Sequence, residues 1–74
     1  MTALTFTRHA LERMREFGIG KSDVEHAVRH YETYVPSRRG CRNYFRRYGA
    51  YRLRITVYPT ADRLLIVTVW KEPE

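Results

Sequence analysis

Residues 51–58 alternate between apolar and polar side chains, and this alternation constrains the fold more than any other feature of the chain. Apolar side chains stand at positions 51, 53, 55 and 57, with Arg52, Arg54 and Thr56 between them. A period of two is that of a strand with one buried face. The run Arg63–Trp70 is rich in β-branched residues and short for a helix, so we expect an antiparallel hairpin closed by Pro59–Asp62.

Pairing Tyr58 with Arg63 sets the predicted register of this hairpin. The residues predicted to share its apolar face, which we expect helices to cover, are Tyr51, Leu53, Ile55, Val57, Leu64, Ile66, Thr68 and Trp70. The residues predicted for the other face are Arg52, Arg54, Leu65, Val67 and Val69. Such a surface, with arginines beside aliphatic side chains, is suited to binding a polyanion.

Two short helices are predicted ahead of the sheet. Thr7 is a good N-cap for a helix over Arg8–Phe17, and Gly18 is a natural terminator. The segment Ser22–Glu25 has the spacing of a capping box, so the second helix starts there and ends near Tyr31. Two helices in series make an αα-hairpin, which can lie across the apolar face of a sheet.

A further strand is predicted over Cys41–Tyr48, joined to the central strand through Gly49 and Ala50. A two-residue turn there would put Arg47 beside Arg52, whereas one extra loop residue would put Arg46 there.

Two shorter segments are weaker strand candidates. Leu4–Phe6 is either a short edge strand or a lead-in, and Thr33–Val35 precedes Pro36, which confines it to a sheet edge or ends it. We therefore expect an α+β fold over residues 1–74 as a single domain, with two N-terminal helices packed on a three- to four-stranded antiparallel sheet.

The net charge and the length of the chain limit the classes of partner that we expect. Lys and Arg number 14 against 8 Asp and Glu, which gives a net charge of +6. All but two of these cations are Arg, whose planar fork favours phosphate or carboxylate, so nucleic acid or an acidic protein is the expected partner. The chain is small enough for marginal stability, which favours complex formation or a homo-oligomer. With a lone Cys41, no membrane span and no signal peptide expected, we predict a cytoplasmic protein.

Nearly the whole chain resembles a small bacterial domain family of unknown function. The resemblance rests on Phe6–Met14, on Gly18 and Ile19, on the Ser-initiated second helix, on the basic strands and on the closing Ile66–Trp70. The family signature, His-Ala-x-x-Arg-Met, stands here at His9–Met14. In layout the family is similar to the RelE-like toxins of toxin–antitoxin systems, including the BrnT branch, which cleave RNA. The resemblance implies a metal-independent endoribonuclease without a cofactor, bound by an acidic antitoxin.

The candidate catalytic residues are His9, Arg13, Arg52 and Arg54. His9 and Arg13 stand four apart, on one side of the first helix. A histidine beside a phosphate-binding arginine can act as general base or acid when a ribose 2′-hydroxyl attacks the adjacent phosphorus. Arg52 and Arg54 would hold the phosphate and stabilise transition-state charge. In the alternative reading, His9 and Arg13 anchor the helix to the sheet by hydrogen bonds.

The candidate nucleic-acid-binding residues are Arg46, Arg47, Arg38, Arg39 and Tyr44. Arg38 and Arg39 lie in a basic loop, and Tyr44 is one of several aromatics interleaved with arginine, a pattern compatible with base stacking. No Asp or Glu stands among residues 41–58 to neutralise these cations. The alternatives are a solvated sheet face for the arginines and a core or edge position for Tyr44.

A metal site is not expected. Asp23, His26 and His30 share a face of the second helix, but no fourth ligand is evident, and a solvated face is the better interpretation. Cys41 has no marked activating partner, so we interpret it as structural or incidental. The alternative function, from a different class, is a non-catalytic module that binds RNA, DNA or an acidic protein through the same cationic surface.

Overall fold

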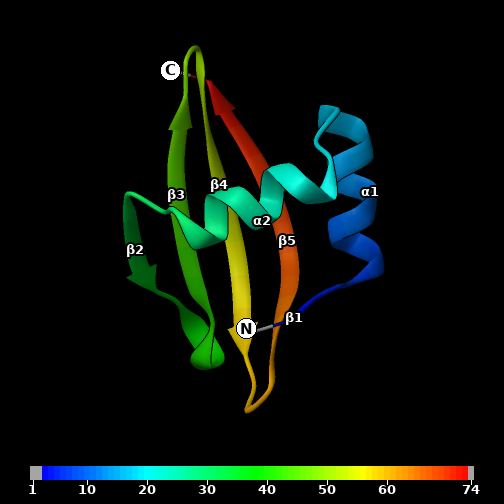
Figure 1. The fold of residues 1–74 in the computed structure, drawn as a ribbon, viewed down its shortest axis with the longest axis vertical. Helices are drawn as coiled ribbons and strands as arrows, with labels where there is room; N and C mark the ends of the chain where they lie inside the picture. The colour runs from blue at the N-terminus through cyan, green and yellow to red at the C-terminus, as the bar shows by residue number, and fades with distance from the viewer. Residues whose placement is uncertain (1–2, 74) are drawn as a thin grey trace.

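The computed structural model describes residues 3–73 (Figure 1). The elements, in chain order, are β1 (Ala3–Phe6), α1 (Arg8–Phe17), α2 (Lys21–Arg29), β2 (Thr33–Pro36), a 3₁₀ turn (Arg38–Gly40), β3 (Arg42–Tyr48), β4 (Tyr51–Pro59) and β5 (Arg63–Pro73). The class is therefore α+β with two helices, as predicted.

Within residues 3–73 the strands form one five-stranded mixed sheet in the order β1-β5-β4-β3-β2. The prediction of three to four antiparallel strands is wrong in two respects, because β1 is a fifth strand and pairs with β5 in parallel. A four-residue strand is too short to show a period, and the partner of Phe6 is Ile66, far along the chain. The other three pairings are antiparallel, as expected.

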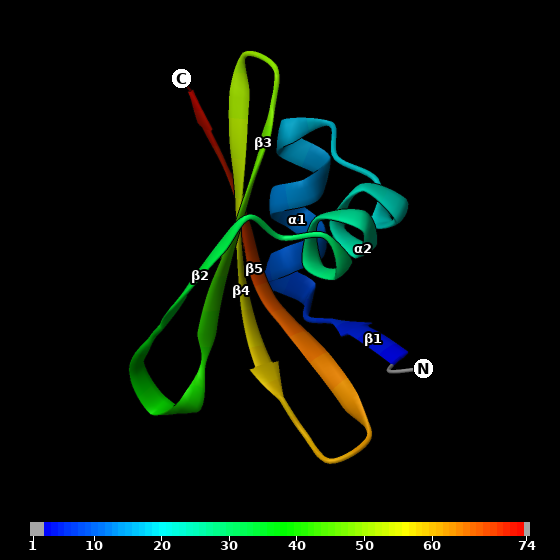
Figure 2. The same ribbon diagram turned by 60° about the vertical axis from the view of Figure 1, so that its left-hand side comes forward.

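Both helices lie on the same side of the sheet, which leaves the other side without helical cover (Figures 1 and 2). α1 packs along β5, whereas α2 crosses β3 and β4. Between the helices and the sheet lies a single cluster of buried residues: Ala10, Met14, Ile19, Val24, Ala27, Val28, Tyr44, Leu53, Ile55, Val57, Ile66 and Val69. Burial of this apolar face is what holds the two layers together.

The bounds of α1 match the prediction at both ends. Thr7 has extended backbone geometry and its hydroxyl accepts a hydrogen bond from the Ala10 N–H at 3.0 Å. Gly18 ends the helix with φ of 69°, a left-handed conformation that glycine adopts without the steric penalty of a β-carbon. Local cap chemistry therefore fixes this helix.

Thr7 also fastens α1 to the sheet, and its loss should be measurable. Its hydroxyl donates to the Val67 carbonyl at 2.7 Å. Replacing Thr7 by Ala removes the cap and this link, and we expect a loss of about 1–2 kcal/mol in unfolding free energy. The melting temperature should fall by about 4–8 °C for each kcal/mol in a domain this small. Thr33→Ala, at an exposed strand position, is the matched control; equal melting temperatures for the two variants would contradict the assignment.

The predicted N-cap of α2, Ser22, is two residues late, and the predicted end near Tyr31 is two residues beyond the observed one. The N-cap is Gly20, whose N–H donates to the Asp23 carboxylate at 2.9 Å, and the helix ends at Arg29. Gly20 and Asp23 stand three residues apart, the same spacing as Ser22 and Glu25. Since Asp23 caps Gly20, the predicted pairing of Ser22 with a glutamate is wrong.

A β-bulge changes the predicted register of the hairpin. Val57 pairs with Ile66 and Thr56 with Thr68, so Val67 is the extra residue. Between the bulge and the turn, Tyr58 pairs with Leu65 and not with residue 63, a separate shift of two residues that leaves the faces unchanged. Beyond the bulge every side chain of β5 changes face relative to β4.

The bulge corrects three predicted positions. Val69 lies in the core at 0% exposure, whereas Thr68 and Trp70 pair with residues of the opposite face. The predicted core placement of Thr68 and Trp70 is therefore wrong, as is the predicted outward placement of Val69. Leu64 and Ile66, which precede the bulge, keep their predicted face.

Candidate nucleic-acid interface

The side of the sheet opposite the helices carries the predicted arginines. Strand residues alternate between faces, so residues that flank buried Leu53 and Ile55 point away from the helices. We call this surface the helix-free face and define it by the outward residues of β3, β4 and β5: Asn43, Phe45, Arg47, Arg52, Arg54, Thr56, Thr68, Trp70 and Glu72.

The turn between β3 and β4 decides which arginine joins Arg52. Tyr48 pairs with Tyr51, so the turn has two residues and Arg47 lies opposite Arg52. Gly49 occupies the turn with φ of 59°. Of the two alternatives left open by the sequence, Arg47 is on the helix-free face, and Arg46 is on the helix side.

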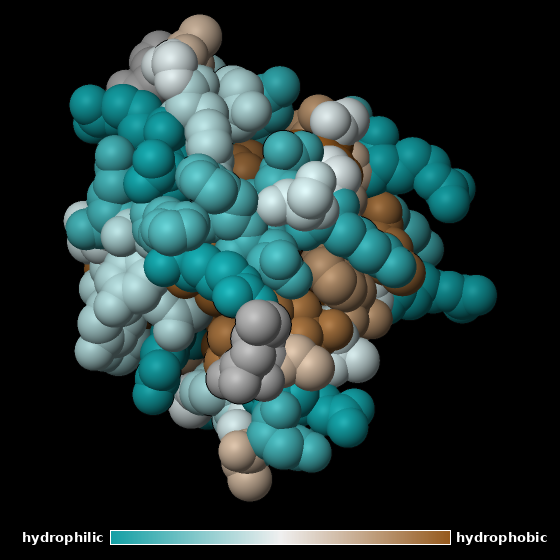
Figure 3. Space-filling model, in the orientation of Figure 1, coloured by the Kyte–Doolittle hydropathy of each residue, from teal (hydrophilic) through white to brown (hydrophobic). Residues whose placement is uncertain are grey.

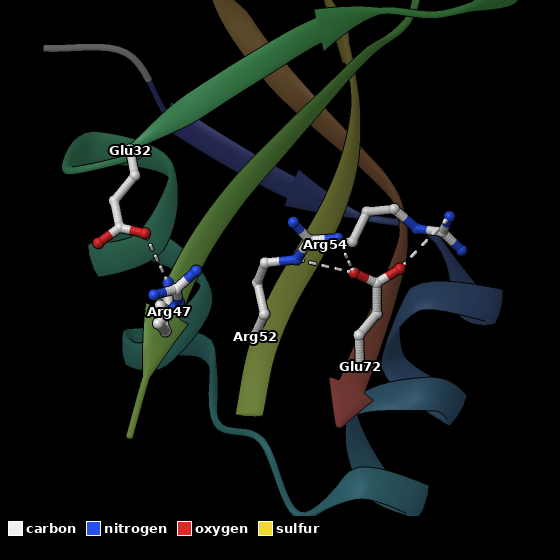
Figure 4. Close-up of polar contacts among 5 residues, drawn as sticks. All are labelled: Glu32, Arg47, Arg52, Arg54 and Glu72. Carbon is white, nitrogen blue, oxygen red and sulfur yellow. Dashed lines mark hydrogen bonds and ion pairs between the residues drawn. The ribbon is translucent and has the colours of Figure 1, made fainter. Parts of the chain in front are cut away.

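Arg52 is held by two neighbours from different strands. Its guanidinium carbon lies 4.6 Å from the Phe45 ring centroid, and its Nε and Nη2 donate to one Glu72 oxygen at 2.9 and 2.6 Å. The other Glu72 oxygen lies 3.7 Å from Arg54 Nη1 (Figure 4). The side chains of Arg52 and Arg54 remain 43% and 41% exposed, so both can still reach a ligand.

Two carboxylates from outside residues 41–58 lie near these arginines, although the sequence analysis expected none to neutralise them. Glu72 lies on β5, beyond the predicted end of that strand, and reaches this face only through sheet pairing. Glu32 accepts a hydrogen bond from the Arg47 backbone N–H at 3.1 Å (Figure 4). The helix-free face is therefore cationic but partly neutralised, and Glu72 orients the guanidinium groups of Arg52 and Arg54.

Arg13 approaches this face around the β5 edge, whereas His9 makes no such contact. The Arg13 guanidinium lies 5.1 Å from the Trp70 ring centroid, and Trp70 pairs with Arg54 across the strands. Phe17 packs edge-on against the same indole at 5.1 Å. Among the residues described, His9 is exposed and forms no hydrogen bond with Arg52 or Arg54. The structure thus places Arg52 and Arg54 together on the helix-free face, brings Arg13 to the neighbouring Trp70, and leaves the histidine apart.

The remaining candidates lie away from the helix-free face. Tyr44 is only 7% exposed and packs against Tyr31 and Tyr34, with ring centroids 4.8 and 5.9 Å away. It is part of the core cluster, so it does not present a ring for stacking. Arg38 and Arg39 are exposed in the 3₁₀ turn that precedes β3. They therefore lie near the N-terminal end of β3, whereas Arg47 lies near its C-terminal end.

A second polar group gathers on the helix side, at the C-terminal end of α2. We call it the imidazole cluster, and its members are His26, His30, Arg46 and Tyr48. His26 Nδ1 lies 2.7 Å from the Tyr48 hydroxyl, and the two imidazole centroids are 4.8 Å apart. The sequence pairs the histidines on one helix face, but Tyr48 stands 22 residues from His26, so only the folded sheet brings it there.

Comparison with known proteins adds no relative: no family model matches the chain, and neither a curated protein nor a solved structure does. Within residues 3–73 no helix is long and apolar enough to cross a membrane. In the same described range, no three His, Cys, Asp or Glu residues gather as a metal site would require.

Proposed function

We propose that this chain binds single-stranded RNA on its helix-free face, as a relative of the RelE/BrnT-like toxins, which are similar in layout to the family that the chain resembles in sequence. The observation that carries the proposal is the packing of Arg52 on Phe45 while Glu72 fixes its guanidinium. A pre-oriented, half-exposed cation next to an aromatic ring can pair with phosphate on one side and stack with a base on the other.

The open face favours a single strand over a duplex. Single strands expose bases that stack on aromatic rings and on arginine planes, and a sheet face with exposed aromatics can serve as the platform. Trp70, 36% exposed and next to Arg54, offers a second stacking surface at the β5 edge. Phosphate contacts by Arg47, Arg52 and Arg54 would run along the same strand of RNA.

An acidic antitoxin is the protein partner implied by the resemblance. It would cover the same arginines, because carboxylates compete with phosphate for a guanidinium fork. We therefore expect a bound antitoxin to displace RNA from the helix-free face.

The test is a fluorescence-anisotropy titration of labelled single-stranded RNA at several salt concentrations. About three phosphate contacts predict that log K falls with log salt with a slope near −2. Duplex RNA of the same sequence should bind more weakly, because its bases are not free to stack. Absence of binding at low salt, with tight binding of an acidic peptide instead, would replace RNA by an acidic protein as the partner.

A further inference from the structure

The imidazole cluster has a geometry suited to proton transfer. His26 lies in the last turn of α2, and His30 is the C-cap residue four positions later. Tyr48 on β3 makes the 2.7 Å hydrogen bond with His26 Nδ1. When Nδ1 carries the proton, it donates to the phenol oxygen and the Nε2 lone pair points elsewhere. The phenol then holds the imidazole in one tautomer and orientation, and Nε2 is available as a base.

The Tyr48 hydroxyl keeps its own proton in this arrangement. Burial raises the pKa of the Tyr48 phenol, and the nearby Arg46 opposes that rise. A phenol with a raised pKa stays protonated at neutral pH, so it can accept from His26 and donate to an anion at the same time.

Arg46 supplies positive charge beside this hydroxyl. Its guanidinium carbon lies 5.5 Å from the Tyr48 ring centroid, and Nη1 donates to the His30 carbonyl at 2.6 Å. Its Nε is buried and has no hydrogen-bond partner among the described residues. Bonding to the helix end and packing on an aromatic ring fix the cation against α2, where it can stabilise negative charge on a bound phosphate.

We propose that the imidazole cluster cleaves RNA by intramolecular transfer to the 2′-oxygen. His26 Nε2 takes the proton of the ribose 2′-hydroxyl while that oxygen bonds to the adjacent phosphorus. The bond from phosphorus to the 5′-oxygen breaks, and protonated His30 gives its proton to that oxygen. The products are a 2′,3′-cyclic phosphate and a 5′-hydroxyl, and proton exchange with water restores both imidazoles. Arg46 and the Tyr48 hydroxyl stabilise the charge on the phosphoryl oxygens.

The cluster lies close to the helix-free face, although on the other side of the sheet. Arg46 and Arg47 are adjacent in β3 and point to opposite faces, and Tyr48 directly precedes the turn to β4. Hydrophilic side chains cover this part of the helix side around α2 (Figure 3). An RNA strand held at Arg47 can therefore pass over the β3–β4 turn to reach His26. Cleavage by the imidazole cluster therefore rests on the proposed RNA binding by the helix-free face.

The test measures cleavage and binding separately in EDTA, with RNA offered both free and in a translating extract. We expect His26→Ala to lower the cleavage rate by at least about 100-fold, the usual contribution of a general base, with RNA affinity unchanged. Tyr48→Phe should lower the rate about tenfold through loss of one hydroxyl, whereas Tyr31→Phe, the matched control on an exposed ring, should leave it unchanged. A substrate with 2′-deoxyribose at the cleaved position should stay intact.

The outcomes separate the two proposals. Binding without cleavage in either setting would overturn this inference and leave the proposed function standing. Cleavage that survives His26→Ala but is lost in His9→Ala would also overturn it and return the histidine of α1 to the active site. Absence of RNA binding would overturn the proposed function. If His26→Ala has a lower melting temperature, Tyr48→Phe and the 2′-deoxy substrate decide the question.

Discussion

Replacing Ile55 by Ala is expected to lower the free energy of unfolding by about 2–5 kcal/mol, the usual range for truncating a buried isoleucine. Ile55 has 0% exposure at the centre of β4, where it pairs with Tyr44 on one side and Val69 on the other. Small domains are only marginally stable, and the free energy of unfolding of a native protein is about 5–15 kcal/mol. A large share of the variant should therefore be unfolded at moderate temperature.

Urea denaturation measures this loss directly. The matched control is Val35→Ala on the edge strand β2, where the side chain is 47% exposed and the change should stay within about 0.5 kcal/mol. Equal midpoints for the two variants would contradict the assignment of Ile55 to the core.

Replacing Arg52 and Arg54 together by Ala is expected to lower the affinity for single-stranded RNA by at least about 100-fold. Each arginine contributes a charge-assisted hydrogen bond of about 1.5–3 kcal/mol, so the pair loses about 3 kcal/mol or more. Glu72 would then stand without its two cations, and its carboxylate would repel phosphate.

A control with the same loss of charge separates this effect from net charge. Arg15 and Arg63 are both exposed, Arg15 on the last turn of α1 and Arg63 beside the β4–β5 turn, where it pairs with Asp62. Their double replacement by Ala should weaken binding only a few-fold through the long-range field. Similar losses in both double variants would mean that RNA binding depends on overall charge and has no defined site.

Local rules predicted the parts of the fold that depend on neighbouring residues. Thr7 and Gly18 bound α1 because caps act within a turn of the helix, and period-two alternation placed Arg52 and Arg54 on one face. The run Leu64–Val69 is apolar or β-branched throughout, so it has no alternation from which the bulge at Val67 could be located. That one residue moves Trp70 from its predicted core position to the helix-free face.

The site was predictable only where one strand carries it. The contact of Glu72 with Arg52 requires the pairing of β4 with β5 and a β5 longer than the predicted strand. The contact between His26 and Tyr48 requires α2 to lie across the sheet, which no spacing in the sequence encodes. Long-range packing, which the sequence does not show, therefore decides which polar side chains work together.

The most direct test of RNA binding by the helix-free face is a side-chain NMR titration with a short single-stranded RNA. The Nε–H signals of Arg52 and Arg54 and the indole N–H signal of Trp70 should shift together and saturate at one equivalent. Shifts confined to the exposed rings of Tyr31 and Tyr34, on the helix side, with these three signals unmoved, would contradict the proposed binding face.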